Sequence, residues 1–131
     1  MTTKEIRKTH VANLIKIAKA DRELTHEEIL FVKTIAIKLD ITSAEFNEIT
    51  LNLEAVKTEL PTTQEGKLRQ LYDILTIMAI DADAHPEEEE MCKSIGKLIG
   101  FSDEQVMKAM KLTKENLDKV ITPEQIEQII A

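Results

Sequence analysis

The chain contains few of the residues on which several protein classes depend. Among 131 residues it has one cysteine, three glycines and three prolines, and aromatic residues make up 3%. A single cysteine cannot form a disulfide framework, so we expect a reducing compartment and a cytoplasmic location. The scarcity of glycine and proline argues against a loop-rich β fold and favours long helices. Because aromatic residues are rare, the core must be built from aliphatic residues and methionine.

The sequence also lacks the features of membrane proteins and of nucleic-acid-binding proteins. Its most apolar segment is free of charge only over residues 74–80, which is far short of a membrane span. The first ten residues carry charges but no apolar run, so we expect no secretory signal. With 24 acidic and 17 basic residues, the net charge is −7. A field of this sign repels phosphate backbones, so we expect no nucleic acid partner.

One acidic pattern occurs twice along the chain. Residues 17–46 align without a gap on residues 77–106, at an offset of 60 positions. The matched pairs are Asp21/Asp81, Glu23/Asp83, Glu27/Glu87, Glu28/Glu88, Lys33/Lys93, Ile35/Ile95, Ile41/Phe101, Thr42/Ser102 and Phe46/Val106. A duplicated unit of helix, acidic turn and helix indicates two similar sites in one fold.

Signals for helix starts and ends are frequent and regular. Capping boxes, in which Ser or Thr precedes Glu or Gln by three residues, begin at Thr25, Thr42, Thr62, Ser102 and Thr122. Pro86 and Pro123 suit first helical positions, and Gly100 suits a C-terminal cap. Together with the helical spacing of the apolar residues, these signals predict helices over about 4–20, 26–39, 43–54, 63–80, 86–99, 103–110 and 114–130, the last with a break near Thr122.

These helices predict an all-α fold, a single bundle of about seven helices built from two pseudo-symmetric helical repeats. One domain covers residues 1–131, with repeat one at about 8–54, repeat two at about 68–110 and a C-terminal helical segment at about 113–130. Each repeat has a long helix whose apolar stripe needs a partner, and the other repeat supplies it. We therefore expect an antiparallel arrangement with a pseudo-two-fold relation between the halves.

Each acidic turn follows the pattern Asp-x-acid-x-x-x-Glu-Glu, in which the first acid ends one helix and the Glu pair opens the next. The Glu pairs have a local explanation, since carboxylates in a first turn stabilise a helix by about 0.3–1 kcal/mol. Asp21 and Asp81 lack one, because a carboxylate at a helix C-terminus opposes the dipole and a second acid stands two residues away. Those second acids are Glu23 and Asp83. A divalent cation, a basic residue or solvent would offset the repulsion.

Stronger site signatures do not fit. Counted as an EF-hand loop from Asp81, position 6 is Pro86 where Gly is required and position 12 is Cys92 where Glu is required. The three histidines do not have the spacing of a zinc site. Cys92 lies in the apolar face of a predicted helix, so we expect a buried core residue. No nucleophile and base stand out as a pair, and we expect a protein that is not an enzyme.

The sequence resembles the TerB-like family, named for a tellurite-resistance protein. The resembling parts are Ile17-Ala-Lys-Ala-Asp21, Leu24 and Glu28 followed by Leu39-Asp-Ile-Thr42, and Ile80-Asp81 and Glu88 followed by Ile99-Gly-Phe-Ser102. The similarity spans about residues 8–110. It implies an all-α bundle of about seven helices with internal pseudo-symmetry, and a role in stress or tellurite response.

The resemblance also implies a metal site, because the acidic residues of the family are proposed to bind metal. Carried onto this chain, those residues are Asp21, Glu28, Asp81 and Glu88, and the spacing adds Glu23 and Asp83. One departure is that the Gly that follows the first acid in the family is Arg22 in one copy and Ala82 in the other. Since Arg22 can neutralise the first cluster, the second turn is the stronger candidate.

Two functions are compatible with these observations. In the first, the chain is a helical module whose acidic turns bind a divalent cation such as Ca²⁺, Mg²⁺, Mn²⁺ or Zn²⁺. In the second, it is a metal-free protein-interaction scaffold whose acidic face binds a basic protein partner. The sequence names neither the metal nor the partner.

Overall fold

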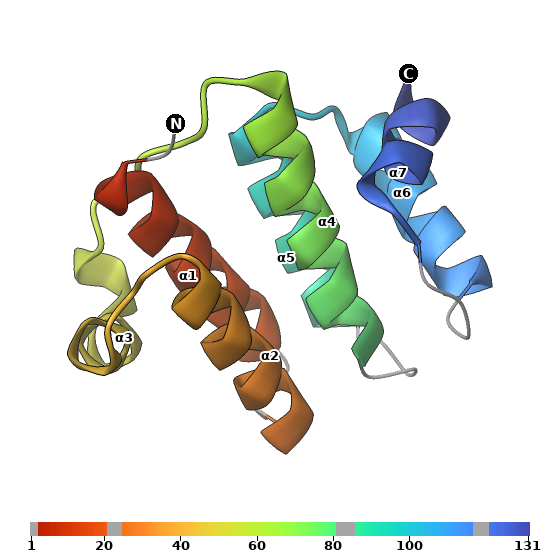
Figure 1. The fold of residues 1–131 in the computed structure, drawn as a ribbon. Coiled ribbons are helices and arrows are strands. Elements are labelled where there is room, and N and C mark those ends of the chain that lie inside the picture. The colour runs from red at the N-terminus through yellow and green to blue at the C-terminus, as the bar shows by residue number, and fades with distance from the viewer. Residues whose placement is uncertain (1–2, 21–24, 81–85, 117–120) are drawn as a thin grey trace.

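The computed structural model describes residues 3–20, 25–80, 86–116 and 121–131 (Figure 1). These residues form seven α-helices and one short 3₁₀ helix, with no strand, so the predicted all-α fold is confirmed. The elements are α1 (Lys4–Ala18), α2 (His26–Lys38), α3 (Ser43–Leu51), η1 (Leu53–Ala55), α4 (Gln64–Ile80), α5 (Pro86–Ile99), α6 (Asp103–Glu115) and α7 (Pro123–Ile130). Within this described part, no helix is long and apolar enough to cross a membrane.

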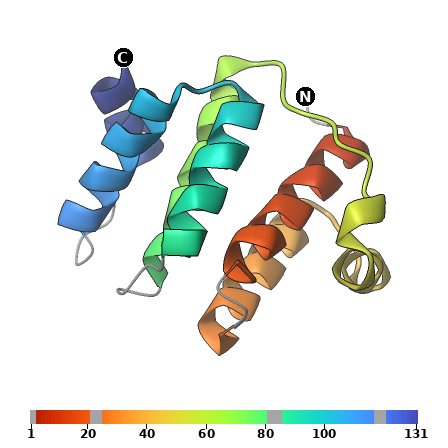
Figure 2. The same ribbon diagram turned by 180° about the vertical axis from the view of Figure 1, so that it is seen from behind.

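Helices α1 and α4 form the centre of the bundle. They pack against each other and run in the same direction, while α2 and α5 each contact both of them and run the opposite way. Figures 1 and 2 show α2 on one side of this pair and α5 on the other. Helix α3 packs on α1, and α6 and α7 pack on α4 at the far side. The central pair is therefore covered on both sides.

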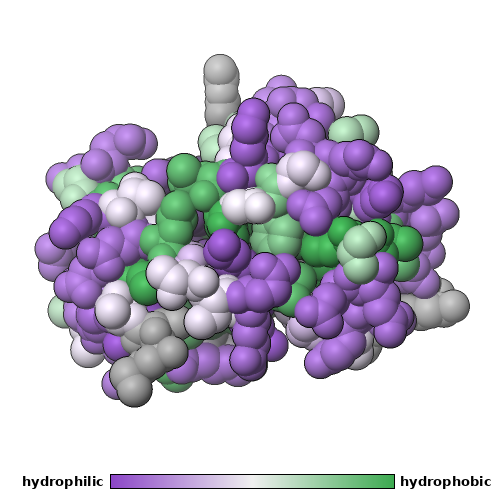
Figure 3. All heavy atoms as spheres, turned by 90° about the horizontal axis from the view of Figure 1, so that it is seen from above, coloured by the Kyte–Doolittle hydropathy of each residue, from purple (hydrophilic) through white to green (hydrophobic). Residues whose placement is uncertain are grey.

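The core is aliphatic, as the composition predicts. Leu14 and Ile17 of α1 and Leu71, Ile74 and Ile77 of α4 have no exposed surface. Their spacing of three and four residues places them on one face of each helix. Figure 3, a view of the bundle from above, shows hydrophobic side chains between the helices and hydrophilic side chains around most of the rim.

The helix ends follow the predicted caps in four of five cases. Thr25, Thr42, Ser102 and Thr122 each form a capping box with the Glu or Gln three residues on. The fifth prediction, Thr62, is wrong by one residue, because the Oγ1 of Thr63 accepts the hydrogen bond from Gly66 N at 3.0 Å. Thr62 and Thr63 are adjacent, and either could cap this helix. Spacing alone favours Thr62, which precedes Glu65 by three residues, but the helix is capped by Thr63.

Helices α2 and α5 end in the same way, at positions 60 residues apart. Asp40 and Gly100 follow them with positive φ angles of 62° and 129°. The next amides bond back to the helix, Ile41 N to Ala36 O at 2.9 Å and Phe101 N to Gly96 O at 3.0 Å. This pattern is the Schellman cap, which places the following apolar side chain back on the core.

The remaining predictions of helix bounds need two corrections. The helix predicted over 43–54 ends at Leu51, and a separate 3₁₀ helix, η1, follows it. Helix α6 runs to Glu115, where a break was expected near 110–114, and the last helix begins only at Pro123. Thr113 is buried, and its Oγ1 donates to Ala109 O at 2.9 Å, so the chain stays helical through this point. The start of α7 agrees with the predicted break near Thr122.

Gly96 allows α5 and α6 to approach closely. A Cβ atom at Gly96 would lie 2.6 Å from Cγ2 of Val106, which is too short for an unshifted contact. The close approach that offsets the cost of a glycine within a helix is therefore present.

The two halves share local geometry but differ in packing. Helix α6 contacts both α4 and α5, whereas α3 contacts α1 and η1. The matching caps and the offset of 60 support a duplicated unit. The pseudo-two-fold relation of the halves stays an interpretation.

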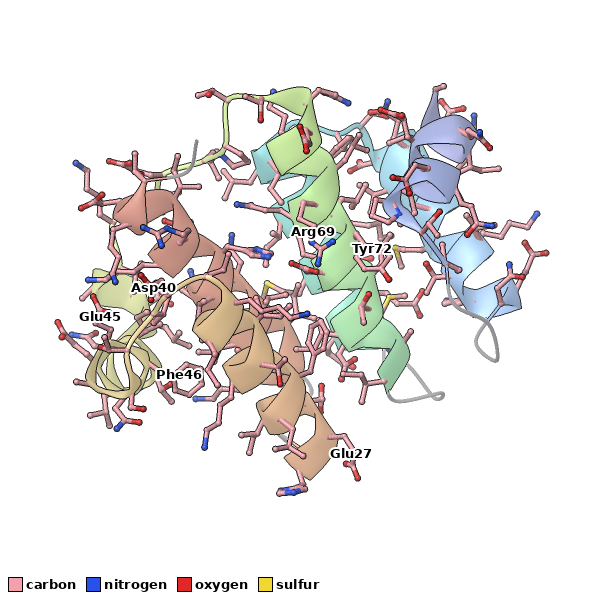
Figure 4. The ribbon with its side chains drawn as sticks, in the orientation of Figure 1. Glu27, Asp40, Glu45, Phe46, Arg69 and Tyr72 are labelled. Atoms are coloured by element: carbon pink, nitrogen blue, oxygen red, sulfur yellow. The ribbon has the colours of Figure 1, made fainter. Side chains whose placement is uncertain are left out.

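The start of α3 is held by a charge network around Glu45 that predicts a pH dependence. Thr42 N donates to Glu45 Oε1 at 2.9 Å, and Lys4 Nζ lies 2.9 Å from the same oxygen. Figure 4 shows Glu45 on α3. The backbone hydrogen bond from Thr42, followed by the bond from Lys4, lowers the pKa of Glu45 from 4.5 to about 2. Because the folded pKa is depressed, its stabilisation is present above pH 4.5 and is lost as the pH falls towards about 2.

We expect Glu45→Gln to flatten the loss of stability over this pH range, measured by urea unfolding at a series of pH values. Glu48→Gln on the same helix is the matched control and should leave the pH profile unchanged. An unchanged profile in Glu45→Gln would contradict the account.

Candidate functional site

The first acidic turn lies between the end of α1 and the start of α2, and Glu28 is the buried one of its two described acids, Glu27 and Glu28. Glu28 is the third residue of α2 and is 1% exposed. Its Oε1 accepts a hydrogen bond from Thr25 N at 3.1 Å, completing the capping box. Its Oε2 is buried and has no hydrogen-bond partner among the described residues. The capping role explains one carboxylate oxygen and leaves the other unexplained.

Glu88 occupies the equivalent place in the second turn. It is the third residue of α5, which Pro86 opens, and it is 0% exposed. Cys92 lies one helical turn further on and is also fully buried, as predicted. Burial raises the pKa of the Cys92 thiol, and the charges of Glu88 and then Glu89 raise it further. Cys92 is therefore an unreactive core residue, and Glu88 is a carboxylate held inside the bundle.

The helix ends that flank the two acidic turns lie at the same end of the bundle. Helices α1 and α4 end there, and α2 and α5 begin there, in both views of the ribbon (Figures 1 and 2). The sequence left open whether the two turns would share one face. Contacts of α1 with α5 and of α2 with α4 tie the four helices together.

Four of the six predicted ligands lie outside the described residues: Asp21, Glu23, Asp81 and Asp83. Within the described ranges, no group of three or more His, Cys, Asp or Glu side chains could hold a metal ion. The metal site therefore stays a prediction. Its donor set is made of carboxylates, which suit Ca²⁺, Mg²⁺ and Mn²⁺, whereas Zn²⁺ favours nitrogen and sulfur ligands.

The outward acids beside the two turns form a second feature. Glu27, Glu87 and Glu90 are exposed, and Figure 4 shows Glu27 at the start of α2. In the second turn, Lys114 lies 2.6 Å from Glu89 and Lys93 lies 3.0 Å from Glu90. The hydrogen bond to Glu90 raises the pKa of Lys93. Part of the negative charge at the start of α5 is therefore neutralised within the chain.

A buried contact between a histidine and an aspartate in the centre of the bundle was not predicted from the sequence. His10 Nε2 of α1 lies 2.8 Å from Asp73 Oδ2 of α4, and both side chains are almost fully buried. Arg69 Nε lies 3.8 Å from the other oxygen of Asp73. The available signal was the position of each residue: His10 precedes the apolar stripe of its helix by one turn, and Asp73 sits between Leu71 and Ile74.

Comparisons with known proteins identify no family. No protein-family model and no solved structure matches the chain. Among curated proteins, utrophin of Rattus norvegicus is 37% identical over 92 residues, which cover 66% of this chain and 3% of utrophin. Because the chain spans about 3% of utrophin's length, the similarity concerns one short stretch of utrophin. It does not assign an activity of utrophin to this chain. The resemblance to the TerB-like family stays a prediction.

Proposed function

We propose that this chain is a non-enzymatic helical module, similar to TerB, that binds a divalent cation through its repeated acidic turns. The proposed ligands are Asp21, Glu23 and Glu28 in the first turn and Asp81, Asp83 and Glu88 in the second. The family resemblance adds a role in stress or tellurite response and agrees with the expected cytoplasmic location. The bound ion would neutralise charge and tie together helices that meet at the turns.

The observation that carries this proposal is the burial of Glu28 and Glu88 at equivalent positions. Carboxylates are rarely buried to this extent unless a charge, a hydrogen bond or a metal compensates them. A capping glutamate normally satisfies its role at the surface, as Glu45 does in α3. Both turn glutamates are buried, and both lie where acids cluster in the sequence. This supports a shared cause of their burial other than helix capping.

A few carboxylates and water bind Ca²⁺ or Mg²⁺ weakly, with a Kd of about 10⁻⁴–10⁻³ M. At ten times Kd, the cation stabilises the fold by about 1.4 kcal/mol, which raises Tm by about 3–8 °C. We expect this rise for the metal-stripped protein and its loss in Asp81→Asn, measured by thermal unfolding. Glu54→Gln, which alters an exposed acid in η1, is the control and should keep the full rise. No rise at millimolar cation would reject the proposal.

The alternative is a metal-free scaffold that binds a basic protein through its acidic face. The exposed side chains of Glu27, Glu87 and Glu90 favour it, because they carry negative charge outward beside both turns. We expect salt-sensitive capture of a basic protein that is lost in a Glu87→Lys, Glu90→Lys variant. The matched variant Glu54→Lys, Glu65→Lys should retain binding. Equal capture by both variants would count against an acidic docking face.

A further inference from the structure

A groove lies between α2 and α3 at the surface of the bundle, and its volume is about 260 Å³. Its lining includes the buried side chains of Ala36 and Ile41 and the more exposed side chains of Ile37 and Phe46. Figure 4 shows Phe46 of α3 on the side that faces α2. The groove therefore presents apolar surface to solvent.

The second half of the chain packs the equivalent helices together. Gly96 and Val106 are the counterparts of Ala36 and Phe46, at the offset of 60 residues. Helix α6 packs on α5, and a Cβ atom at Gly96 would lie 2.6 Å from Val106. Ala36 and Phe46 are both larger than their counterparts, and α3 packs on α1. The larger residues therefore account for the groove between α2 and α3.

The outer face of α2 is apolar where that of α5 is charged. Leu30 and Ile37 are 51% and 76% exposed, and because they are seven residues apart they lie on one stripe of α2. Their counterparts on α5 are Glu90 and Lys97, and both are exposed. The duplicated helix thus carries charges at these positions where they face solvent. Apolar residues at the same positions, beside an apolar groove, indicate a surface that a partner covers.

A lysine beside this surface lacks the acid that its counterpart has. In α5, Lys93 Nζ lies 3.0 Å from Glu90 Oε1. The counterparts of these two residues on α2 are Lys33 and Leu30, so the place of the acid is taken by an apolar residue. The described lining of the groove includes Lys33 and no acidic side chain. The surface therefore suits a partner that supplies a carboxylate next to apolar groups.

We propose that this face of α2 and α3 binds an amphipathic helix of a partner protein, with an acidic residue beside its apolar stripe. Helices that bind in grooves use apolar anchors three, four and seven residues apart, which matches the separation of Leu30 and Ile37. One anchor enters the groove, and the carboxylate pairs with Lys33. None of the proposed cation ligands lines the groove, so this proposal does not depend on the cation.

The test is an NMR titration of the backbone amides of the full chain with a synthetic peptide of about 18 residues, long enough to become helical. The probe has Leu at positions three and four apart and Glu beside them, and a second peptide has Lys in place of each Glu. We expect saturable shifts in α2 and α3 with the Glu peptide. The Lys peptide should bind this groove at least about threefold more weakly. Absence of saturable shifts in α2 and α3, or equal affinity of the two peptides there, would overturn the proposal.

A double variant gives α2 the residues that α5 carries. Leu30→Glu with Ile37→Lys changes two exposed positions, so the fold should persist, and it removes both apolar anchors of the surface. We expect it to weaken the Glu peptide by at least about tenfold. Leu98→Ala, which alters a half-exposed leucine of α5 outside the groove, is the matched control and should retain the affinity. Equal affinities of the double variant and the control would overturn the proposal.

Sedimentation distinguishes a partner helix from a second copy of the chain. We expect the protein without peptide to be a monomer at the concentrations of the titration. A dimer that dissociates in the double variant would mean that a second copy covers this face, and it would overturn the proposal.

Discussion

Replacing His10 with alanine is expected to lower the free energy of unfolding by about 3–5 kcal/mol. The change leaves the Asp73 carboxylate buried between α1 and α4 without the imidazole that lies 2.8 Å from it. Arg69 compensates little of this loss, because its Nε is 3.8 Å away and its side chain is more than half exposed. Asp73→Ala should cost a similar amount, since it leaves the imidazole unpaired. Urea unfolding followed by circular dichroism measures both effects.

A double variant separates the polar contact between His10 and Asp73 from the packing of their side chains. His10→Leu with Asp73→Leu removes both polar groups and fills similar space, and such replacements are often neutral or stabilising. We therefore expect the double variant to be more stable than either alanine variant. A cost below about 1 kcal/mol for both single changes would show that the pair does not hold α1 against α4.

Replacing Ile17 or Ile77 with alanine is expected to cost about 2–5 kcal/mol in each case. The two residues are 60 positions apart, belong to α1 and α4, and have no exposed surface. Removing three carbon atoms at either place leaves a cavity that the packed aliphatic core cannot fully close. Because both helices belong to one core, each variant should unfold in a single cooperative transition.

The control for this pair is Ile37→Ala, at a position that is 76% exposed. It should change stability by less than about 0.5 kcal/mol. Two separate transitions in either core variant would contradict a single domain and would mean that one half folds without the other.

Local features of the fold could be predicted from the sequence because they depend on neighbours in the chain. A capping box involves residues three apart, and four of the five predicted boxes form. The cap at Gly100 could be predicted for the same reason. The end of α6 could not, since Thr113 is buried by tertiary packing and no local signal distinguishes it from a break.

In the candidate site, too, the sequence predicts some features, and others depend on how the helices pack. The pattern identified Glu28 and Glu88 as members of the acidic turns, but first-turn glutamates are usually exposed, and only the fold places these two inside. His10 and Asp73 were missed because they are 63 residues apart, and neither carries a motif of its own. Pairing at that distance depends on how α1 meets α4, which periodicity does not specify.

We propose that the carboxylates of the two acidic turns bind a divalent cation. The most direct measurement is calorimetric titration of the metal-stripped protein with Ca²⁺, Mg²⁺, Mn²⁺ and Zn²⁺. Asp21→Asn, Asp81→Asn and Glu28→Gln variants are run in parallel. The account predicts saturable heat with at least one ion, lost in Asp81→Asn and retained in the control Glu54→Gln. Flat traces for all four ions would contradict it.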